Sequence, residues 1–137
     1  FLNHALKETV MPFVRAFVPQ SLSDVQIRAV SQAVHQALVD AFKIPPKDRF
    51  QVITRHAPSE LVCAPEYLGI EHSETVALIQ ITAKEGRTVE MKKHLFERIA
   101  KLIDATGAVR ASDVIISLVE NKEENWSFGN GIAQYAV

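Results

Sequence analysis

The pattern of apolar and polar residues along the chain predicts four strands and two helices. Short apolar runs between turn residues indicate strands, and apolar residues that recur every three or four positions indicate helices. The predicted strands span residues 13–18, 50–54, 75–83 and 113–119, and the predicted helices span residues 25–42 and 89–105. The order strand–helix–strand, which occurs twice, is typical of the α/β class.

Both predicted helices have an apolar stripe and recognisable ends. Ser21 or Ser23 can cap the first helix, Pro45-Pro46 cannot continue it, and Gly107 is a C-terminal cap for the second. The first stripe consists of Val30, Ala33, Val34, Ala37, Leu38, Ala41 and Phe42, and the second of Leu95, Ile99, Leu102 and Ile103. Each helix is therefore expected to pack one face against a sheet.

The two halves of the chain repeat the same plan. A shift of 65 positions places four stripe residues of the first helix on four of the second, and it places Asp48 on Asp113. Each half, residues 12–56 and residues 75–120, should form a β-α-β unit with parallel strands. We expect the units to merge into one four-stranded mixed sheet with both helices on one face. The other face then needs a partner, which indicates an oligomer.

The remaining segments connect or flank these units. Residues 57–74, with two prolines and a glycine, are expected to be a connector, and residues 121–137 a short hairpin or an arm. Within this region, residues 120–124 are most simply a solvated turn. We interpret residues 1–11 as a leader and residues 12–137 as a single domain.

Composition narrows the class of protein. The 137 residues are 47% apolar with a net charge of -1, which gives no indication of a nucleic-acid partner. No apolar run approaches the roughly 20 residues that cross a membrane. Cys63 is the only cysteine and fits a reducing compartment, and the five histidines lack metal-ligand spacing. We expect a cytoplasmic globular protein without a metal.

The dipeptide Met11-Pro12 stands directly before the first predicted strand. If the chain starts at Met11 and this residue is removed, Pro12 carries a secondary amine that can accept and donate a proton. While residues 1–11 remain attached, the same nitrogen belongs to a tertiary amide and has almost no basicity. Pro12 is then an ordinary proline at the edge of a strand.

Several segments carry a resemblance to a known family. A proline that opens the first strand of a doubled β-α-β chain resembles the tautomerase superfamily. Residues 44–52 (IPPKDRFQV), 113–121 (DVIISLVEN) and 125–129 (NWSFG) are similar to its malonate semialdehyde decarboxylase branch. The resemblance covers about residues 12–135. It implies an α+β fold of the tautomerase/MIF-like type, a homotrimer, and chemistry that needs no cofactor.

The same resemblance implies a set of site residues. The family has an amino-terminal proline, an aspartate before the second strand and two arginines after the third strand. These positions hold Pro12, Asp48, Lys84 and Arg87, so a lysine replaces the first arginine and the turn is one residue longer. Lysine cannot make the planar two-pronged contact of arginine with a carboxylate, so this replacement affects which substrate the site can bind.

We expect each of these residues to have a distinct role. Pro12 transfers the proton or forms an iminium with an aldehyde substrate, and Asp48 orients Pro12 or activates a water molecule. Arg87, assisted by Lys84, binds the carboxylate of a small oxo acid. The aromatic residues expected to wall the pocket are Phe50, Trp126 and Phe128.

Structural interpretations stand beside these roles. Asp48 can simply cap the turn that follows the two prolines, as Asp113 does at the matching position. Arg87 can be an ordinary residue at a helix start, and Trp126 a packing residue.

The expected function is enol–keto tautomerisation of a 2-oxo acid or decarboxylation of malonate semialdehyde. The alternative is a non-catalytic family member or an oligomeric binding protein in which the retained leader blocks Pro12.

Overall fold

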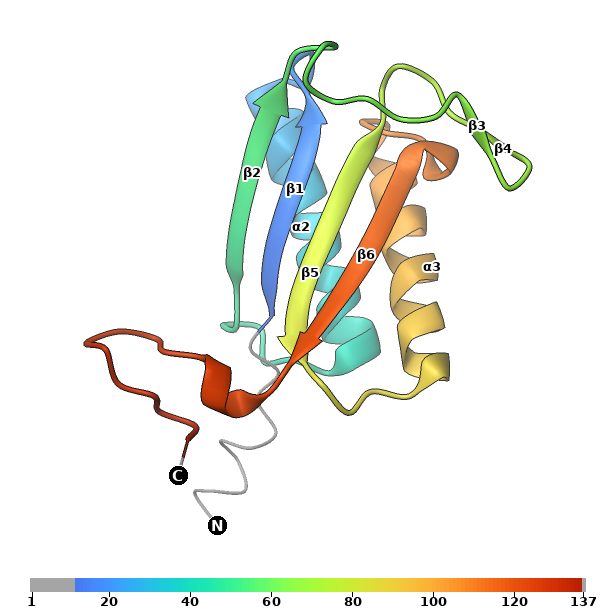
Figure 1. Cartoon of the computed structure of the whole chain (residues 1–137). Coiled ribbons are helices and arrows are strands. Elements are labelled where there is room, and N and C mark those ends of the chain that lie inside the picture. Colours follow the sequence, from blue (N-terminus) through green and yellow to red (C-terminus); the bar gives the residue numbers. More distant parts are fainter. Residues whose placement is uncertain (1–11, 137) are drawn as a thin grey trace.

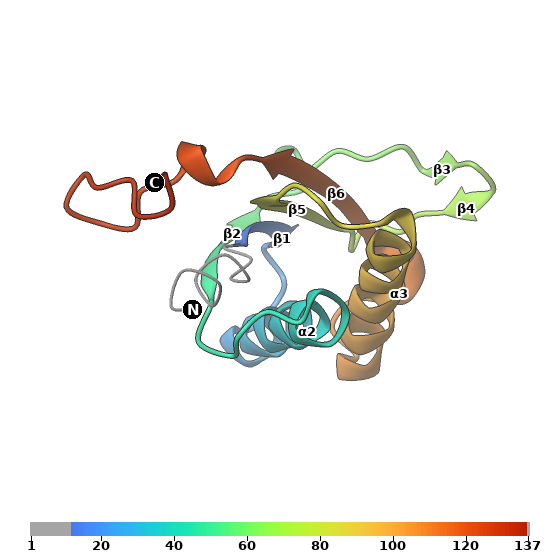
Figure 2. The same cartoon turned by 90° about the horizontal axis from the view of Figure 1, so that it is seen from below.

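Four long strands form a mixed sheet, and two helices cover one of its faces (Figures 1 and 2). The computed structural model describes residues 12–136. The strands of the sheet are β1 (Phe13–Pro19), β2 (Phe50–His56), β5 (Ala77–Lys84) and β6 (Val114–Asn121), and the helices are α2 (Asp24–Phe42) and α3 (Val89–Thr106). All six predicted elements are thereby confirmed, with ends shifted by no more than two residues.

The sheet has the strand order β2-β1-β5-β6. Strands β1 and β2 are parallel, β5 and β6 are parallel, and the central pair β1 and β5 is antiparallel. Each β-α-β unit thus contributes one parallel pair, and the two units meet in the middle of the sheet. This is the predicted four-stranded mixed sheet with both helices on one face.

The ends of the helices follow from local hydrogen bonds. Of the two candidate serines, Ser23 caps α2: its hydroxyl accepts from the backbone N–H of Gln26 at 3.2 Å, and the Gln26 side chain accepts in return from the Ser23 N–H at 2.9 Å. Thr88 caps α3 in a similar way. Gly107 ends α3 with φ 76°, a left-handed conformation that glycine adopts without a steric penalty.

The core lies between the sheet and the helices because alternate strand residues point to the same side. Val14, Ala16 and Val18 of β1 and Ile79 and Ile81 of β5 are buried there. They pack against the predicted stripes of α2 and α3.

Within residues 12–136 no element covers the opposite face of the sheet (Figure 2). Phe50 and Val52 of β2 remain 47% and 46% exposed on it.

The connector and the tail are less regular. The connector contains a small hairpin of β3 (Glu66–Tyr67) and β4 (Ile70–Glu71), which its turn residues did not predict. The tail, which we call the arm, contains a 3-10 helix, η2 (Glu123–Asn125), followed by turns (Figure 1). The predicted leader lies outside the described residues. No helix in the described part of the chain is long and apolar enough to cross a membrane.

Candidate functional site

The predicted site residues come together at one end of the sheet. In the register, Phe13 at the start of β1 lies opposite Phe50 at the start of β2 and opposite Thr82 near the end of β5. Pro12, which precedes β1, is buried at this end, and Lys84 is the last residue of β5. Asp48 stands two residues before β2 and is also buried. Strand starts and strand ends therefore meet here because the central pair is antiparallel (Figure 1).

The segment around Asp48 is fastened to helix α2 on both sides of the aspartate. The ring nitrogen Nε2 of buried His35 lies 2.8 Å from the carbonyl oxygen of Pro46, so it donates a hydrogen bond to that oxygen. The guanidinium of Arg49 donates to the hydroxyl of Ser31 at 2.8 Å. Sequence reasoning missed His35 and Ser31 because neither belongs to the apolar stripe. The helix thus sets the position of the Asp48 backbone.

The matching aspartate of the second repeat, Asp113, is held differently. It is 1% exposed, and its carboxylate accepts hydrogen bonds from the Ser73 backbone N–H at 2.8 Å, from the Ser73 hydroxyl and from Arg110 Nε at 3.0 Å. Burial alone raises the pKa of Asp113, but the bonds from Ser73 and the charge of Arg110 outweigh it and lower the pKa. The repeat places Ala100 where α2 has His35. Asp113 therefore fastens the connector to the start of β6.

Arg87 is half-buried between the end of β5 and the end of α2. Its Nη1 donates to the Lys84 carbonyl oxygen at 2.9 Å, and its guanidinium carbon lies 5.1 Å from the centre of the Phe42 ring. Burial lowers the pKa of Arg87, and the nearby Glu120 carboxylate opposes this shift. The guanidinium of an arginine nevertheless remains charged at neutral pH. Arg87 is thus a preformed cation at the end of the sheet.

Lys84 is part of an ion pair, which the sequence did not predict. Its Nζ lies 2.8 Å from Glu123 Oε1, and both side chains are only about a quarter exposed, at 24% and 25%. A second pair joins Lys92 to Glu120 at 2.9 Å. The prediction of a solvated turn over residues 120–124 is therefore wrong. Strand β6 continues to Asn121, and two glutamates of the segment, Glu120 and Glu123, pair with cations.

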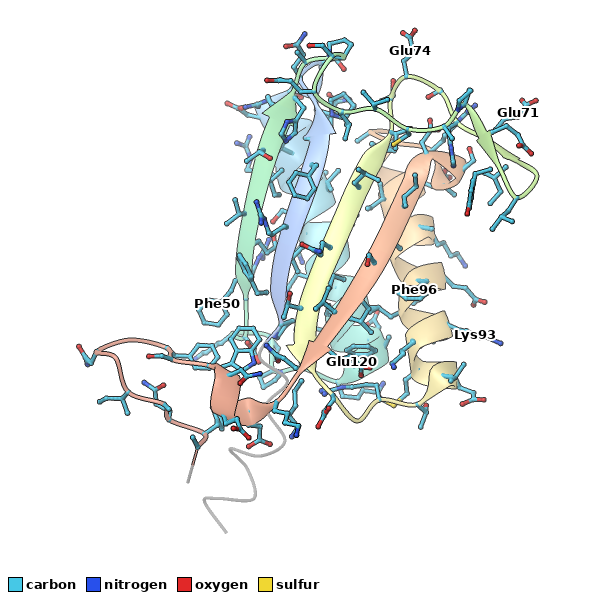
Figure 3. The ribbon with its side chains drawn as sticks, viewed as in Figure 1. Phe50, Glu71, Glu74, Lys93, Phe96 and Glu120 are labelled. Carbon is cyan, nitrogen blue, oxygen red and sulfur yellow. The ribbon has the colours of Figure 1, made fainter. Side chains whose placement is uncertain are left out.

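The aromatic residues predicted as pocket walls form one cluster. The Phe50 and Phe128 rings lie 5.5 Å apart, Trp126 stacks on Phe128 at the same distance, and Tyr135 meets Phe128 edge-on at 6.0 Å. Trp126 Nε1 also donates to Asn121 Oδ1 at 2.7 Å. Tyr135 was not predicted, although its position in an aromatic-rich tail is a signal. The cluster packs the arm against the start of β2, where Figure 3 shows Phe50 beside the strand and next to the arm.

No group of three or more histidine, cysteine, aspartate or glutamate side chains within residues 12–136 is arranged to hold a metal ion.

Comparison with known proteins identifies the family. A family model described as "Tautomerase enzyme" matches residues 48–129, and a second model with the same description matches residues 12–70. The chain belongs to the tautomerase family. It is 40% identical over 124 residues to the probable tautomerase YusQ of Bacillus subtilis (strain 168), covering 90% of this chain and 98% of that relative.

Solved structures of tautomerases have the same fold. The FG41 malonate semialdehyde decarboxylase inhibited by 3-bromopropiolate is 40% identical, with a TM-score of 0.84 over 90% of this chain and 93% of that one. Another malonate semialdehyde decarboxylase is 32% identical, with a TM-score of 0.83 over 90% and 95%. A fused 4-OT symmetric trimer is 22% identical, with a TM-score of 0.75 over 90% and 98%, and shares the fold. The resemblance to the malonate semialdehyde decarboxylase branch is confirmed.

Proposed function

We propose that this tautomerase uses the amine of Pro12 to transfer a proton on a small oxo acid. The reaction is the enol–keto tautomerisation of a 2-oxo acid or the decarboxylation of malonate semialdehyde. The observation that carries the proposal is the position of Pro12, Asp48 and Arg87 at the same end of the sheet. The decarboxylase relatives support the choice of substrates.

In the tautomerisation, Pro12 acts first as a base and then as an acid. Its amine takes the proton from the enol oxygen, the electron pair moves to make the carbonyl, and the same proton goes to the neighbouring carbon. An amino-terminal amine titrates near neutral pH, and nearby cations such as Arg87 lower the pKa while the Asp48 carboxylate raises it. The amine exists only after the bond between Met11 and Pro12 is cleaved.

In the decarboxylation, protonated Pro12 polarises the aldehyde carbonyl, or the neutral amine adds to it and forms an iminium as the carbonyl oxygen leaves as water; in the second route water later hydrolyses the product iminium and frees the amine. The bond to the carboxylate breaks, carbon dioxide leaves, and the electron pair is held by the polarised carbonyl or iminium. The resulting enol or enamine carbon then takes a proton. The tautomerisation and the iminium route both start from the neutral amine of Pro12, whereas the polarising route starts from the protonated amine.

The other residues bind and orient the substrate. Arg87 binds the carboxylate with its planar guanidinium, and Lys84 assists to the extent that its pairing with Glu123 allows. Asp48 orients Pro12 or activates a water molecule. Phe50, Trp126 and Phe128 wall the site and limit the access of solvent, because their rings pack the arm against the start of β2.

A homotrimer in the cytoplasm is the proposed state. The uncovered sheet face, with its exposed Phe50 and Val52, supports association. The fused 4-OT of the same fold is a trimer. Cys63, as the only cysteine, supports a reducing compartment.

One observation favours a second candidate. The chain as printed still carries Met11 before Pro12, so a protein that keeps residues 1–11 has no amine at this position. Such a protein is a non-catalytic family member or an oligomeric binding protein.

The mass of the protein made from its own gene separates the two candidates. A chain that begins at Pro12 is expected for the enzyme. In that chain, Pro12→Ala should lower turnover of enol-phenylpyruvate or malonate semialdehyde by about 10²–10⁴-fold. Unchanged turnover would show that Pro12 takes no part in the mechanism. A protein that keeps its leader would rule out the proline mechanism, because Pro12 would then have no free amine.

A further inference from the structure

The charges around the end of β5 are almost balanced. Three cations, Lys84, Arg87 and Lys92, interact with two carboxylates, Glu120 and Glu123. Lys92 pairs with Glu120, and Glu120 also acts on Arg87. Lys84 has Glu123 as its carboxylate. Glu123 therefore offsets the charge of Lys84 at a distance of 2.8 Å, whereas Arg87 keeps its guanidinium for a substrate carboxylate.

Glu123 is held in place by the arm. It belongs to η2, and its carbonyl oxygen accepts from the Trp126 backbone N–H at 3.3 Å. The Trp126 indole in turn donates to Asn121 at the end of β6. The pair of Lys84 and Glu123 is three-quarters buried, so solvent and salt screen it less than they screen a surface pair. A neighbouring glutamate, Glu124, is exposed on the same 3-10 helix.

We propose that Glu123 is a specificity-determining residue that restricts this site to acids with one carboxylate. The inference rests on the proposed function, because it assumes that Arg87 binds the substrate carboxylate. A second carboxylate on the substrate would need Lys84 as its cation and would meet the negative charge of Glu123 instead. The aromatic cluster beside this pair suits an uncharged carbon chain.

Two five-carbon 2-oxo acids test the proposal. 2-Oxopentanoate has one carboxylate, and 2-oxoglutarate has a second carboxylate at the far end of the same chain. Titration calorimetry gives both dissociation constants for the wild-type protein, Glu123→Gln and Glu124→Gln. The two variants remove the same charge from the same helix, but only one of the two glutamates pairs with Lys84.

The ratio of the two constants, 2-oxoglutarate over 2-oxopentanoate, is the readout. In Glu123→Gln the ratio should fall about 10-fold, because Glu123 no longer offsets the charge of the partly buried Lys84, which then attracts the second carboxylate of 2-oxoglutarate. In Glu124→Gln it should stay within about 2-fold of the wild-type value, as for an exposed charge. Adding Lys84→Met to Glu123→Gln should restore the wild-type ratio.

Each outcome decides the proposal. An equal change in both glutamate variants, or no change in either, would overturn it while the site still binds 2-oxopentanoate. If the wild-type protein binds neither acid, the carboxylate site of the proposed function fails, and the inference fails with it. If Glu123→Gln does not fold, Lys84→Met alone serves: it removes the cation beside Glu123, so it should weaken the binding of 2-oxoglutarate more than that of 2-oxopentanoate, and an equal loss for both acids would refute the assignment.

Discussion

Replacing Asp113 with asparagine separates the role of this aspartate from that of Asp48, its counterpart in the first repeat. Asp113 is fully buried and fastens the connector through Ser73 and Arg110, whereas Asp48 lies at the candidate site. We expect Asp113→Asn to lower stability with little change in turnover at a temperature where the variant is folded. We expect Asp48→Asn to lower turnover by about 10²-fold or more.

The magnitude for Asp113 follows from its hydrogen bonds. Two come from Ser73, and a hydrogen bond to a charged group contributes about 1.5–3 kcal/mol. Arg110 is 53% exposed, so its bond adds little. Asparagine keeps one acceptor oxygen but turns an NH2 group toward one of the donors. The loss should be about 3 kcal/mol, or roughly 10 °C in Tm for a chain of this length.

The lowered pKa of Asp113 also makes the stability of the protein depend on pH. The folded-state pKa of Asp113 is lowered, so the folded state binds fewer protons at this group than the unfolded state does. Its contribution is complete above the ordinary aspartate pKa, near 4, and is lost as the pH falls through the lower folded value. Asp113→Asn should therefore lose less stability than the wild type when the pH is lowered from about 5 to 3.

Thermal unfolding followed by circular dichroism measures Tm, urea unfolding at several pH values measures the pH dependence of stability, and turnover of enol-phenylpyruvate measures function. A Tm within about 2 °C of the wild type would refute the structural role. A pH dependence identical to that of the wild type would refute the charge argument, even if the variant were less stable.

Substitutions at three further residues test other contacts. Arg87→Lys should raise KM for the oxo acid by about 10–100-fold, because lysine keeps the charge but loses the planar contact and the stacking on Phe42; an unchanged KM would contradict its carboxylate role. Phe128→Ala should shift the fluorescence of Trp126, the only tryptophan, to longer wavelength, because it removes the ring that stacks on the indole; an unchanged spectrum would show that the arm does not depend on this stack. His35→Leu should lower the free energy of unfolding by about 1–3 kcal/mol in urea, because it leaves a carbonyl oxygen without its donor, while His35→Gln should recover part of the loss; equal losses in both variants would contradict the hydrogen-bond argument.

The fold was largely predictable from the sequence because its determinants are local or periodic. The apolar stripes of α2 and α3, the cap at Ser23 and the left-handed position at Gly107 are each decided by residues within a few positions of one another. The repeat then limited the topology, because parallel units with right-handed connections combine in few ways. The hairpin of β3 and β4 escaped prediction because two-residue strands have no detectable period.

The site was predictable only in part. The resemblance proposed Pro12, Asp48, Lys84 and Arg87 as site residues, and the register of the antiparallel central pair explains why these positions lie at the same end of the sheet. The ion pair of Lys84 with Glu123 joins residues from different elements, and no periodicity indicates such a contact.

The sequence by itself determined the strands, the helices, the repeat and the types of residue available for chemistry. The tertiary structure decided which of these residues meet and with what charge. His35 shows the same division: it looks like an ordinary helix residue until the chain returns and brings the Pro46 carbonyl within 2.8 Å. The physical reason is that secondary structure depends on neighbours along the chain, whereas hydrogen bonds and ion pairs at a site depend on distances that exist only after the sheet and the helices have packed.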